Sequence, residues 1–271
     1  MNEGVRKNLR RGVYVIPTLF TMLNLLFGFL SIINATRGIV AISENRFDLS
    51  AGYFERAAWM LFIAAIFDTF DGLVARGLGA TSEFGKEYDS LADVVTFGCA
   101  PAVLVYAWGL HVLGNLGAGV SFLFLAAVSL RLARFNVMTG KTDYRYFVGL
   151  PSPAGALTLA SIVSYAPSPI TDVDRKFAFV ILLVTAATAF AMVSPVRYRS
   201  QKGLNLQKER SLMHFMFVGV ILVVAIYRPK EFFFIVAITY LASGPLLKLW
   251  SIAFPPRKLG DDDALAPVEM P

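Results

Sequence analysis

Residues 68–93 read DTFDGLVARGLGATSEFGKEYDSLAD and lie between two apolar stretches, WMLFIAAIF at 59–67 and VVTFGCAPAVLVYAW at 94–108. The polar stretch holds six of the nineteen acidic residues of the chain. An ionised side chain inside a bilayer is costly, by about 2.5–3.5 kcal/mol at the centre of a span and less near its edge. Acidic residues gathered at the ends of two membrane spans therefore indicate a functional site.

The composition of the whole chain predicts an all-α integral membrane protein. Of its 271 residues, 56% are hydrophobic, and the mean hydropathy is +0.60. The apolar residues form continuous blocks of about 20 residues, the length that a helix needs to cross a bilayer, and they do not alternate as the strands of a membrane barrel do. About eight transmembrane helices are predicted, over 14–36, 54–76, 89–110, 116–137, 149–167, 175–194, 211–228 and 231–254.

The basic residues predict how the chain is oriented in the membrane. With both termini in the cytoplasm, fifteen of the 25 Lys and Arg residues fall in cytoplasmic segments and seven on the opposite side, in agreement with the positive-inside rule. The net charge of +6 is then a topology signal, and no nucleic-acid partner is expected. We predict a multi-pass protein of the cytoplasmic (inner) membrane, with a basic cytoplasmic segment over 1–13, a membrane-embedded domain over 14–254 and a disordered acidic tail over 255–271.

The carboxylates fall on one stripe of each of two neighbouring helices. Residues three and four positions apart share a helix face, and this spacing joins Asp68, Asp71, Gly72 and Ala75 before the polar connection, and Ser82, Gly85, Asp89 and Asp93 after it. Because the connection is short, the two helices are predicted to be antiparallel neighbours, so that four carboxylates converge. Like charges at this density require cations, and carboxylate oxygens favour Mg²⁺, Mn²⁺ or Ca²⁺.

Two alternatives stay open on spacing alone. Gly72 and Gly85 either let a ligand lie against the helix backbone or let two membrane helices pack closely. The carboxylates also suit a cation-coupled membrane transporter. However, a transporter gathers its ion ligands near the middle of the bilayer, whereas these carboxylates flank a connection that is predicted to be cytoplasmic.

The same residues resemble the signature of the CDP-alcohol phosphatidyltransferase family, D-x2-D-G-x2-A-R-x8-G-x3-D-x3-D. All eight fixed positions match at every spacing, namely Asp68, Asp71, Gly72, Ala75, Arg76, Gly85, Asp89 and Asp93. The resemblance implies a six-helix catalytic core, a homodimer embedded among membrane lipids, and a CDP-linked lipid or alcohol as the phosphatidyl donor. It also implies a divalent metal, Mg²⁺ or Mn²⁺, bound as two ions, and the distribution of Lys and Arg predicts that this site faces the cytoplasm.

The resemblance further implies a role for each matched residue. Asp68, Asp71 and Asp89 resemble the metal ligands, and Asp93 completes the metal site and resembles the general base. The implied CDP-lipid-binding set consists of Gly72, Ala75, Arg76, Ser82 and Gly85. Metal ions would neutralise the donor pyrophosphate and orient the attacking and leaving oxygens, while the base takes the proton of the acceptor alcohol in a direct in-line transfer that releases CMP.

Three further stretches resemble the membrane-spanning phosphatidylserine synthases within this family: PTLFTMLNLLFGF at 17–29, RLARFNV at 131–137 and YFVGLPSPAGA at 146–156. This resemblance implies that the phosphatidyl group passes from CDP-diacylglycerol to L-serine, giving phosphatidylserine and CMP. Glycerol 3-phosphate, inositol phosphate and choline stay open as acceptors for the same chemistry.

A pocket for serine is predicted from Arg131, Arg134 and Asn136, at the cytoplasmic end of the fourth expected span. A guanidinium can bind a carboxylate through two parallel hydrogen bonds. Of the two arginines, we expect Arg134 to bind the serine carboxylate, and Arg131 to contribute less if its side chain extends to the lipid headgroups. In the first span, Thr21 and Asn24 are expected to hydrogen-bond either the donor or a neighbouring helix, and a contact between helices is the interpretation for Asn24.

Overall fold

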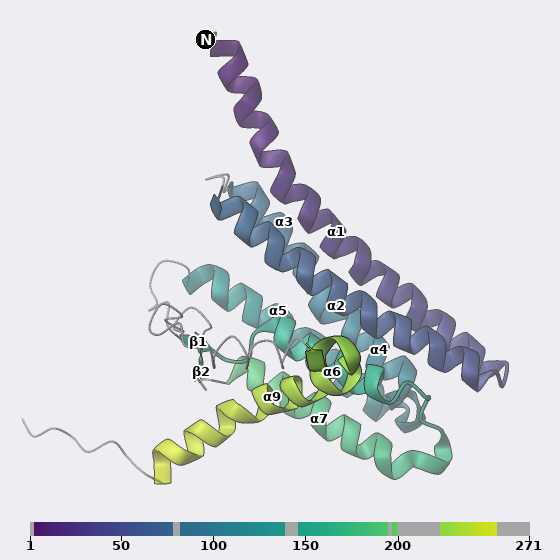
Figure 1. Ribbon diagram of the computed structural model, residues 1–271. Coiled ribbons are helices and arrows are strands. Elements are labelled where there is room, and N and C mark those ends of the chain that lie inside the picture. Colours follow the sequence, from purple (N-terminus) through teal and green to yellow (C-terminus); the bar gives the residue numbers. More distant parts are fainter. Residues whose placement is uncertain (1–2, 78–81, 139–145, 195–196, 200–222, 254–271) are drawn as a thin grey trace, which may run out of the picture.

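The computed structural model describes residues 3–77, 82–138, 146–194, 197–199 and 223–253. This part of the chain contains eight α-helices and one small antiparallel sheet, which confirms the prediction of a helical protein (Figure 1). The predicted tail over 255–271 and most of the span predicted over 211–228 lie outside the described residues. Residues 3–13 of the predicted N-terminal segment belong to the first helix.

The elements follow one another along the chain with short connections. The helices are α1 (Glu3–Ser43), α2 (Phe47–Gly77), α3 (Glu83–Asp93), α4 (Ala100–Trp108), α5 (Asn115–Met138), α6 (Ser152–Tyr165), α7 (Arg175–Val193) and α9 (Pro229–Ala253). A π-helical segment, η1 (Val94–Cys99), joins α3 to α4, and the short 3-10 segments η2 (Leu110–Leu113) and η3 (Asp172–Asp174) precede α5 and α7. The strands β1 (Tyr146–Val148) and β2 (Arg197–Arg199) pair with Phe147 opposite Tyr198.

Among the described residues, five helical segments are long and apolar enough to cross a membrane. They are Pro17–Ser43, Phe47–Gly77, Glu83–Trp108, Asn115–Val137 and Asp172–Val193. These segments correspond to the spans predicted over 14–36, 54–76, 89–110, 116–137 and 175–194. The chain is therefore a multi-pass membrane protein by the length and composition of its helices, while the orientation of its termini stays a prediction.

The span predicted over 149–167 is a shorter helix in the structure. α6 has 14 residues, whereas a helix needs about 20 to cross the hydrocarbon core. Most of its residues are buried, and it packs against α2, α4 and α9. Neighbouring helices therefore cover α6 where lipid would cover a span. Hydropathy does not distinguish the two cases, because both require a continuous apolar run.

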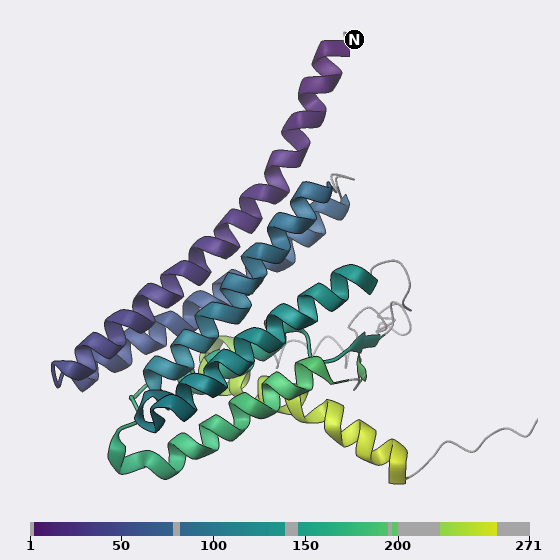
Figure 2. The same ribbon diagram turned by 180° about the vertical axis from the view of Figure 1, so that it is seen from behind.

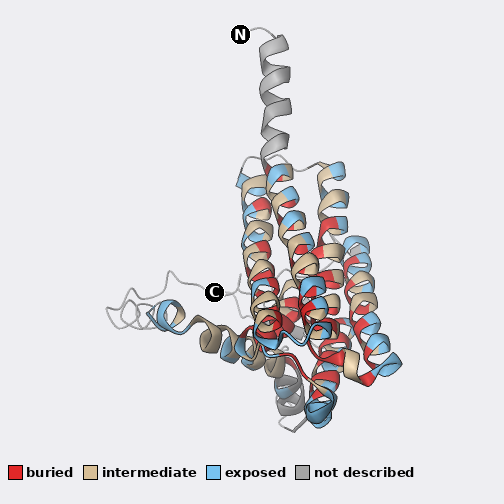
Figure 3. Ribbon diagram, turned by 90° about the vertical axis from the view of Figure 1, so that its right-hand side faces the viewer, coloured by how far each residue is buried: buried red, intermediate tan, exposed pale blue. Residues whose placement is uncertain are grey.

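The helices form a bundle in which α1 is the longest element. α1 and α2 run antiparallel and side by side, and α1 also packs along α3 and η1 (Figures 1 and 2). On the other side of the bundle α5 packs against α7, and α9 against α6. Buried residues lie mainly on the faces that the helices turn towards one another, as Figure 3 shows. This packing leaves the adjoining ends of α2 and α3 as the place where polar residues collect.

A close contact between α1 and the π-helical segment η1 fixes the surroundings of Asp93. A Cβ atom at Gly28 would lie 2.5 Å from Thr96 Oγ1 and 2.8 Å from Thr96 Cα, so a side chain there would force the helices apart. The Thr96 hydroxyl donates a hydrogen bond of 3.3 Å to the backbone carbonyl oxygen of Asn24. π-helical turns within α-helices are frequent at functional sites, and this one begins directly after Asp93.

We expect Gly28→Ala to destabilise the protein by about 1–3 kcal/mol, because the added methyl group overlaps the backbone of η1. Gly119→Ala is the matched control, since nothing lies within 4 Å of a Cβ atom at that position of α5. The midpoints of thermal unfolding of the purified proteins in detergent measure the difference. Equal midpoints for the two variants would contradict the close contact between α1 and η1.

Candidate active site

Three aspartates from two helices form a carboxylate cluster. Asp68 and Asp71 lie in the last turns of α2, and Asp89 lies on α3. One carboxylate oxygen from each lies within 4.8 Å of the other two. Asp71 is buried, and Asp68 and Asp89 are half-buried. The two helix faces that the sequence predicts to carry the carboxylates therefore lie opposite each other across the α2–α3 connection.

The cluster has the chemistry of a divalent metal site. All of its ligand atoms are carboxylate oxygens, the donors that hard cations such as Mg²⁺, Mn²⁺ and Ca²⁺ prefer. Asp89 Oδ1 is buried and accepts no hydrogen bond from the described residues. A buried carboxylate oxygen without a partner is costly, and a cation would satisfy it. The three residues therefore fit a bound metal ion.

Asp93 is the last residue of α3 and lies one helical turn beyond Asp89. It is buried and does not belong to the group of three, but it interacts electrostatically with all of them. Its Oδ1 atom accepts a hydrogen bond of 3.2 Å from Asn24 Nδ2 on α1. Asp93 therefore stands beside the cluster, in an orientation that Asn24 helps to hold.

Two polar residues of α1 contact the carboxylates, and the hydrogen bond from Asn24 to α3 is the contact between helices that was expected of it. Thr21 Oγ1 lies 3.1 Å from Asp71 Oδ2 and also 3.2 Å from the Pro17 carbonyl oxygen, and Asn24 holds Asp93. Both side chains are buried, and their spacing of three residues places them on one face of α1. Polar residues three positions apart on one face of a largely apolar span are the signal that the sequence carries.

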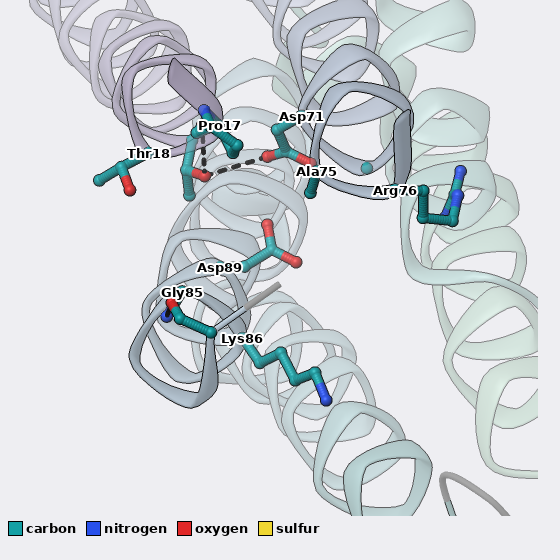
Figure 4. A pocket seen from close by; sticks show the side chains of 11 residues that line it. Pro17, Thr18, Asp71, Ala75, Arg76, Gly85, Lys86 and Asp89 are labelled. Carbon is teal, nitrogen blue, oxygen red and sulfur yellow. Dashed lines mark hydrogen bonds between the residues drawn. The ribbon is translucent and has the colours of Figure 1, made fainter. Parts of the chain in front are cut away.

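A pocket opens beside the cluster and contains every residue of the implied CDP-lipid-binding set. It has a volume of about 180 Å³ and is lined by Pro17, Thr18, Thr21, Asp71, Gly72, Ala75, Arg76, Ser82, Gly85, Lys86 and Asp89. The carboxylates of Asp71 and Asp89, from α2 and α3, face the same space (Figure 4). At its rim, Ser82 Oγ accepts a hydrogen bond of 3.0 Å from Gly85 N and caps α3.

The two glycines of the pocket do not serve close packing of helices. The three atoms nearest to a Cβ atom at Gly72 would all belong to the side chain of Arg76, at 3.6 Å or more, and one at Gly85 would meet only the Oγ atom of Ser82, at 3.0 Å. At neither glycine would an added Cβ atom be close to the backbone of a neighbouring helix, whereas at Gly28 it would be. The arrangement favours the alternative in which a ligand lies against the backbone at Gly72 and Gly85.

Arg131 and Asn136 of the predicted serine pocket have different hydrogen-bond partners. Arg131 Nη1 donates a hydrogen bond of 2.9 Å to Ser152 Oγ at the start of α6, and the guanidinium interacts electrostatically with Asp93. Arg134 is exposed, and exposed Asn136 donates a hydrogen bond of 2.9 Å to Ser90 Oγ on α3. The serine pocket and the ranking of its arginines therefore stay predictions, and Arg131 is the arginine that interacts electrostatically with Asp93.

The fold and the carboxylate cluster define a class of membrane enzyme, and the comparisons with known proteins identify it. Residues 14–193 match the family model described as CDP-alcohol phosphatidyltransferase, so the chain belongs to the CDP-alcohol phosphatidyltransferase family. This membership decides against the transporter alternative. α9 lies outside the matched residues.

Several curated relatives are similar to this chain over most of their length. A CDP-diacylglycerol–serine O-phosphatidyltransferase of Helicobacter pylori is 32% identical over 226 residues, which cover 81% of this chain and 84% of the relative. The archaetidylserine synthase of Methanothermobacter thermautotrophicus is 33% identical, and the aligned residues cover 70% of this chain and 72% of the relative. A CDP-diacylglycerol–serine O-phosphatidyltransferase of Saccharomyces cerevisiae is 36% identical over 60% of this chain and 55% of the relative.

Proposed function

We propose that the protein is a CDP-diacylglycerol–serine O-phosphatidyltransferase, which transfers the phosphatidyl group of CDP-diacylglycerol to L-serine and releases CMP. The observation that carries this proposal is that serine is part of the name of each relative cited above, whether it comes from a bacterium, an archaeon or a yeast. The distribution of Lys and Arg supports a site that faces the cytoplasm, and membership of the family supports a homodimer.

The donor is proposed to bind in the pocket beside the carboxylate cluster. Gly72, Ala75 and Gly85 leave room for the nucleotide against the helix backbones, and Ser82 lies at the rim. Arg76 lines the same pocket, where its guanidinium can form a charge-assisted hydrogen bond to a phosphate oxygen. The cluster would hold Mg²⁺ or Mn²⁺, as two ions, and the bound metal supplies positive charge that neutralises the pyrophosphate.

Asp93 is proposed to act as the general base. Its Oδ1 atom accepts a hydrogen bond from Asn24, which orients the carboxylate that would accept the proton of the serine hydroxyl. As this proton moves to Asp93, the serine oxygen forms a bond to the phosphorus that carries the diacylglycerol. The bond between this phosphorus and the bridging oxygen breaks in line, and CMP leaves with the bridging oxygen.

Arg131 is proposed to bind the carboxylate of serine. Its Nε atom is buried and has no hydrogen-bond partner among the described residues, so a donor is available beside the base. A guanidinium and a carboxylate match in planar geometry and in charge. Arg134 and Asn136 would then contribute at the rim of the site, since both are exposed.

We expect Arg131→Ala to raise the KM for serine about ten- to a hundredfold, because the variant loses a charge-assisted hydrogen bond that is worth roughly 1.5–3 kcal/mol. The KM for CDP-diacylglycerol should change less than threefold, because Arg131 does not line the donor pocket. Arg134→Ala is the comparison and should change the KM for serine less than threefold. Steady-state kinetics in mixed micelles measure these constants, and a larger effect for Arg134→Ala would restore the ranking expected from the sequence.

A panel of acceptors with labelled CDP-diacylglycerol tests the proposed function directly. The purified protein is incubated with serine, glycerol 3-phosphate, inositol phosphate or choline, and the lipid product is identified. Phosphatidylserine as the main product supports the proposal. If serine is ignored and another acceptor is consumed, the protein is still a member of its family and the assignment of serine is wrong.

A further inference from the structure

The stretch YFVGLPSPAGA, residues 146–156, leads from β1 into α6 and packs on the end of α7. Gly149 has a φ of 83°, which residues with a side chain rarely adopt, and a Cβ atom there would overlap the carbonyl oxygen of Met192 on α7. The backbone N–H of Leu150 donates a hydrogen bond of 3.0 Å to the carbonyl oxygen of Ala191. These contacts fix the place where α6 begins, so the first residue of this helix has a defined position.

That first residue is Ser152, and it contacts Arg131 of α5. Ser152 is 0% exposed, and its Oγ atom accepts a hydrogen bond of 2.9 Å from Arg131 Nη1. The Nη1 atom lies on the side of the guanidinium that faces away from the Nε–H group. Arg131 Nε is buried and has no hydrogen-bond partner among the described residues. Ser152 therefore holds one side of the guanidinium and leaves the Nε side for another acceptor.

Two contacts fix how α5 lies beside α3 and η1. Asn136, near the end of α5, donates its hydrogen bond to Ser90 on α3. Further from that end, a Cβ atom at Gly98 of η1 would lie 3.3 Å from Val128 Cγ1 on α5. The later residue of α5 thus pairs with the earlier residue of the α3–η1 segment, so the two segments run antiparallel.

This arrangement places Arg131 and Asp93 at similar levels of the bundle. Arg131 follows Val128 by three residues and Asp93 follows Ser90 by three, so each lies on the helix face that makes these contacts. At a rise of 1.5 Å per residue, Asp93 lies about 4.5 Å beyond Ser90, and Arg131 about 7.5 Å before Asn136. Counting from the second contact also places the two residues at similar levels. Arg131 is therefore positioned on the side of α5 that lies beside the proposed base.

We propose that Ser152 is a positioning residue of the acceptor site, and that its hydroxyl holds the guanidinium of Arg131 so that the Nε edge binds the carboxylate of serine. This inference rests on the proposed transfer to serine. Two parallel N–H groups of a guanidinium match the two oxygens of a carboxylate only in one relative orientation. A long side chain loses rotational freedom when it binds, and a hydrogen bond that already restricts the side chain reduces this loss.

A hydroxyl that only stabilises the start of α6 makes a different prediction. Its removal would disturb the site as a whole, and the KM values for serine and for CDP-diacylglycerol would rise together. A hydroxyl that acts through Arg131 affects only the recognition of acceptors that have a carboxylate. Serinol keeps the amine and the hydroxyl groups but has no carboxylate, so it separates the two roles.

The experiment compares Ser152→Ala with Ser161→Ala in the full chain, reconstituted in phospholipid nanodiscs. Ser161 also lies on α6 and is 0% exposed, but its hydroxyl donates to the carbonyl oxygen of Thr158 in the same helix, so it serves as the matched control. For Ser152→Ala we expect the KM for serine to rise about three- to tenfold, as for the loss of one hydrogen bond. The preference for serine over serinol should fall by a similar factor, while the KM for CDP-diacylglycerol stays within about twofold.

The same substitution in the Arg131→Ala background tests whether Ser152 acts through Arg131. Two residues that act through one interaction do not have additive effects. Without the guanidinium, Ser152→Ala should therefore change the KM for serine by less than about twofold. A full effect in this background would contradict the inference, because Ser152 would then act on serine by another route.

Three further results would overturn the inference. They are a KM for serine in Ser152→Ala that equals that of the native protein, an effect of the same size in Ser161→Ala, or an equal rise in the KM for CDP-diacylglycerol. Failure of the proposed function is recognised separately, because the native protein would then make no phosphatidylserine in the same assay. If the native protein uses serine, and Arg131→Ala raises the KM for serine but Ser152→Ala does not, only the role of Ser152 is wrong.

Discussion

Asp71→Asn is expected to lower kcat/KM for CDP-diacylglycerol by more than about a hundredfold, a larger loss than is usual for residues that only orient a metal ligand. Asparagine has nearly the same shape as aspartate, and it keeps an oxygen that can accept a hydrogen bond from Thr21. The loss therefore reports the missing negative charge in the group of three carboxylates. With that charge removed, the site holds a divalent cation weakly, and the pyrophosphate of the donor is no longer neutralised.

The matched control for this variant is Asp48→Asn. Asp48 is exposed and lies in the first turn of α2, at the opposite end of the helix that carries Asp71. Its substitution should leave both activity and Mn²⁺ affinity unchanged, whereas calorimetric titration should show weak Mn²⁺ binding to Asp71→Asn. Chelation with EDTA should abolish the activity of the native protein, and added Mg²⁺ or Mn²⁺ should restore it. Full activity in excess EDTA would remove the metal from the mechanism.

The sequence predicts the carboxylate cluster well because the cluster depends on local rules. Helical periodicity fixes which residues of α2 and of α3 share a face, and the short connection between the helices keeps the two faces close. The five spans are predictable for a similar reason, since the length and hydropathy of each run decide whether it can cross a bilayer. The span predicted over 149–167 differs, because the apolar run of α6 is covered by α2, α4 and α9, and α9, predicted as a span over 231–254, is also not among the five.

The surroundings of Asp93 could not be predicted, because they depend on contacts between distant parts of the chain. Asn24 reaches Asp93 only because α1 approaches η1 closely at Gly28, and no local pattern in the sequence marks η1 as π-helical. The roles of Arg131 and Arg134 depend on the rotation of α5 about its axis. Residues three positions apart point in different directions by about 60°, and packing of α5 against its neighbours decides which one faces Asp93.

Asp93→Asn separates binding from chemistry and is expected to reduce turnover by about 10²- to 10⁴-fold, the usual contribution of a general base. An amide cannot take the proton of the serine hydroxyl, although it fits the same space. Asp68, Asp71 and Asp89 remain in this variant, so CDP-diacylglycerol should still bind in the presence of Mn²⁺. Single-turnover kinetics and equilibrium binding of labelled donor measure the two quantities independently.

The comparison of the two asparagine variants decides the role of Asp93. A general base predicts retained donor binding with slow chemistry for Asp93→Asn, and loss of both for Asp71→Asn. If Asp93→Asn also loses donor binding, Asp93 acts mainly as a fourth metal ligand, and its electrostatic interaction with the other three carboxylates is the reason. If it turns over at the native rate, the proton of serine goes to another group, and the hydrogen bond from Asn24 holds a carboxylate with a structural role.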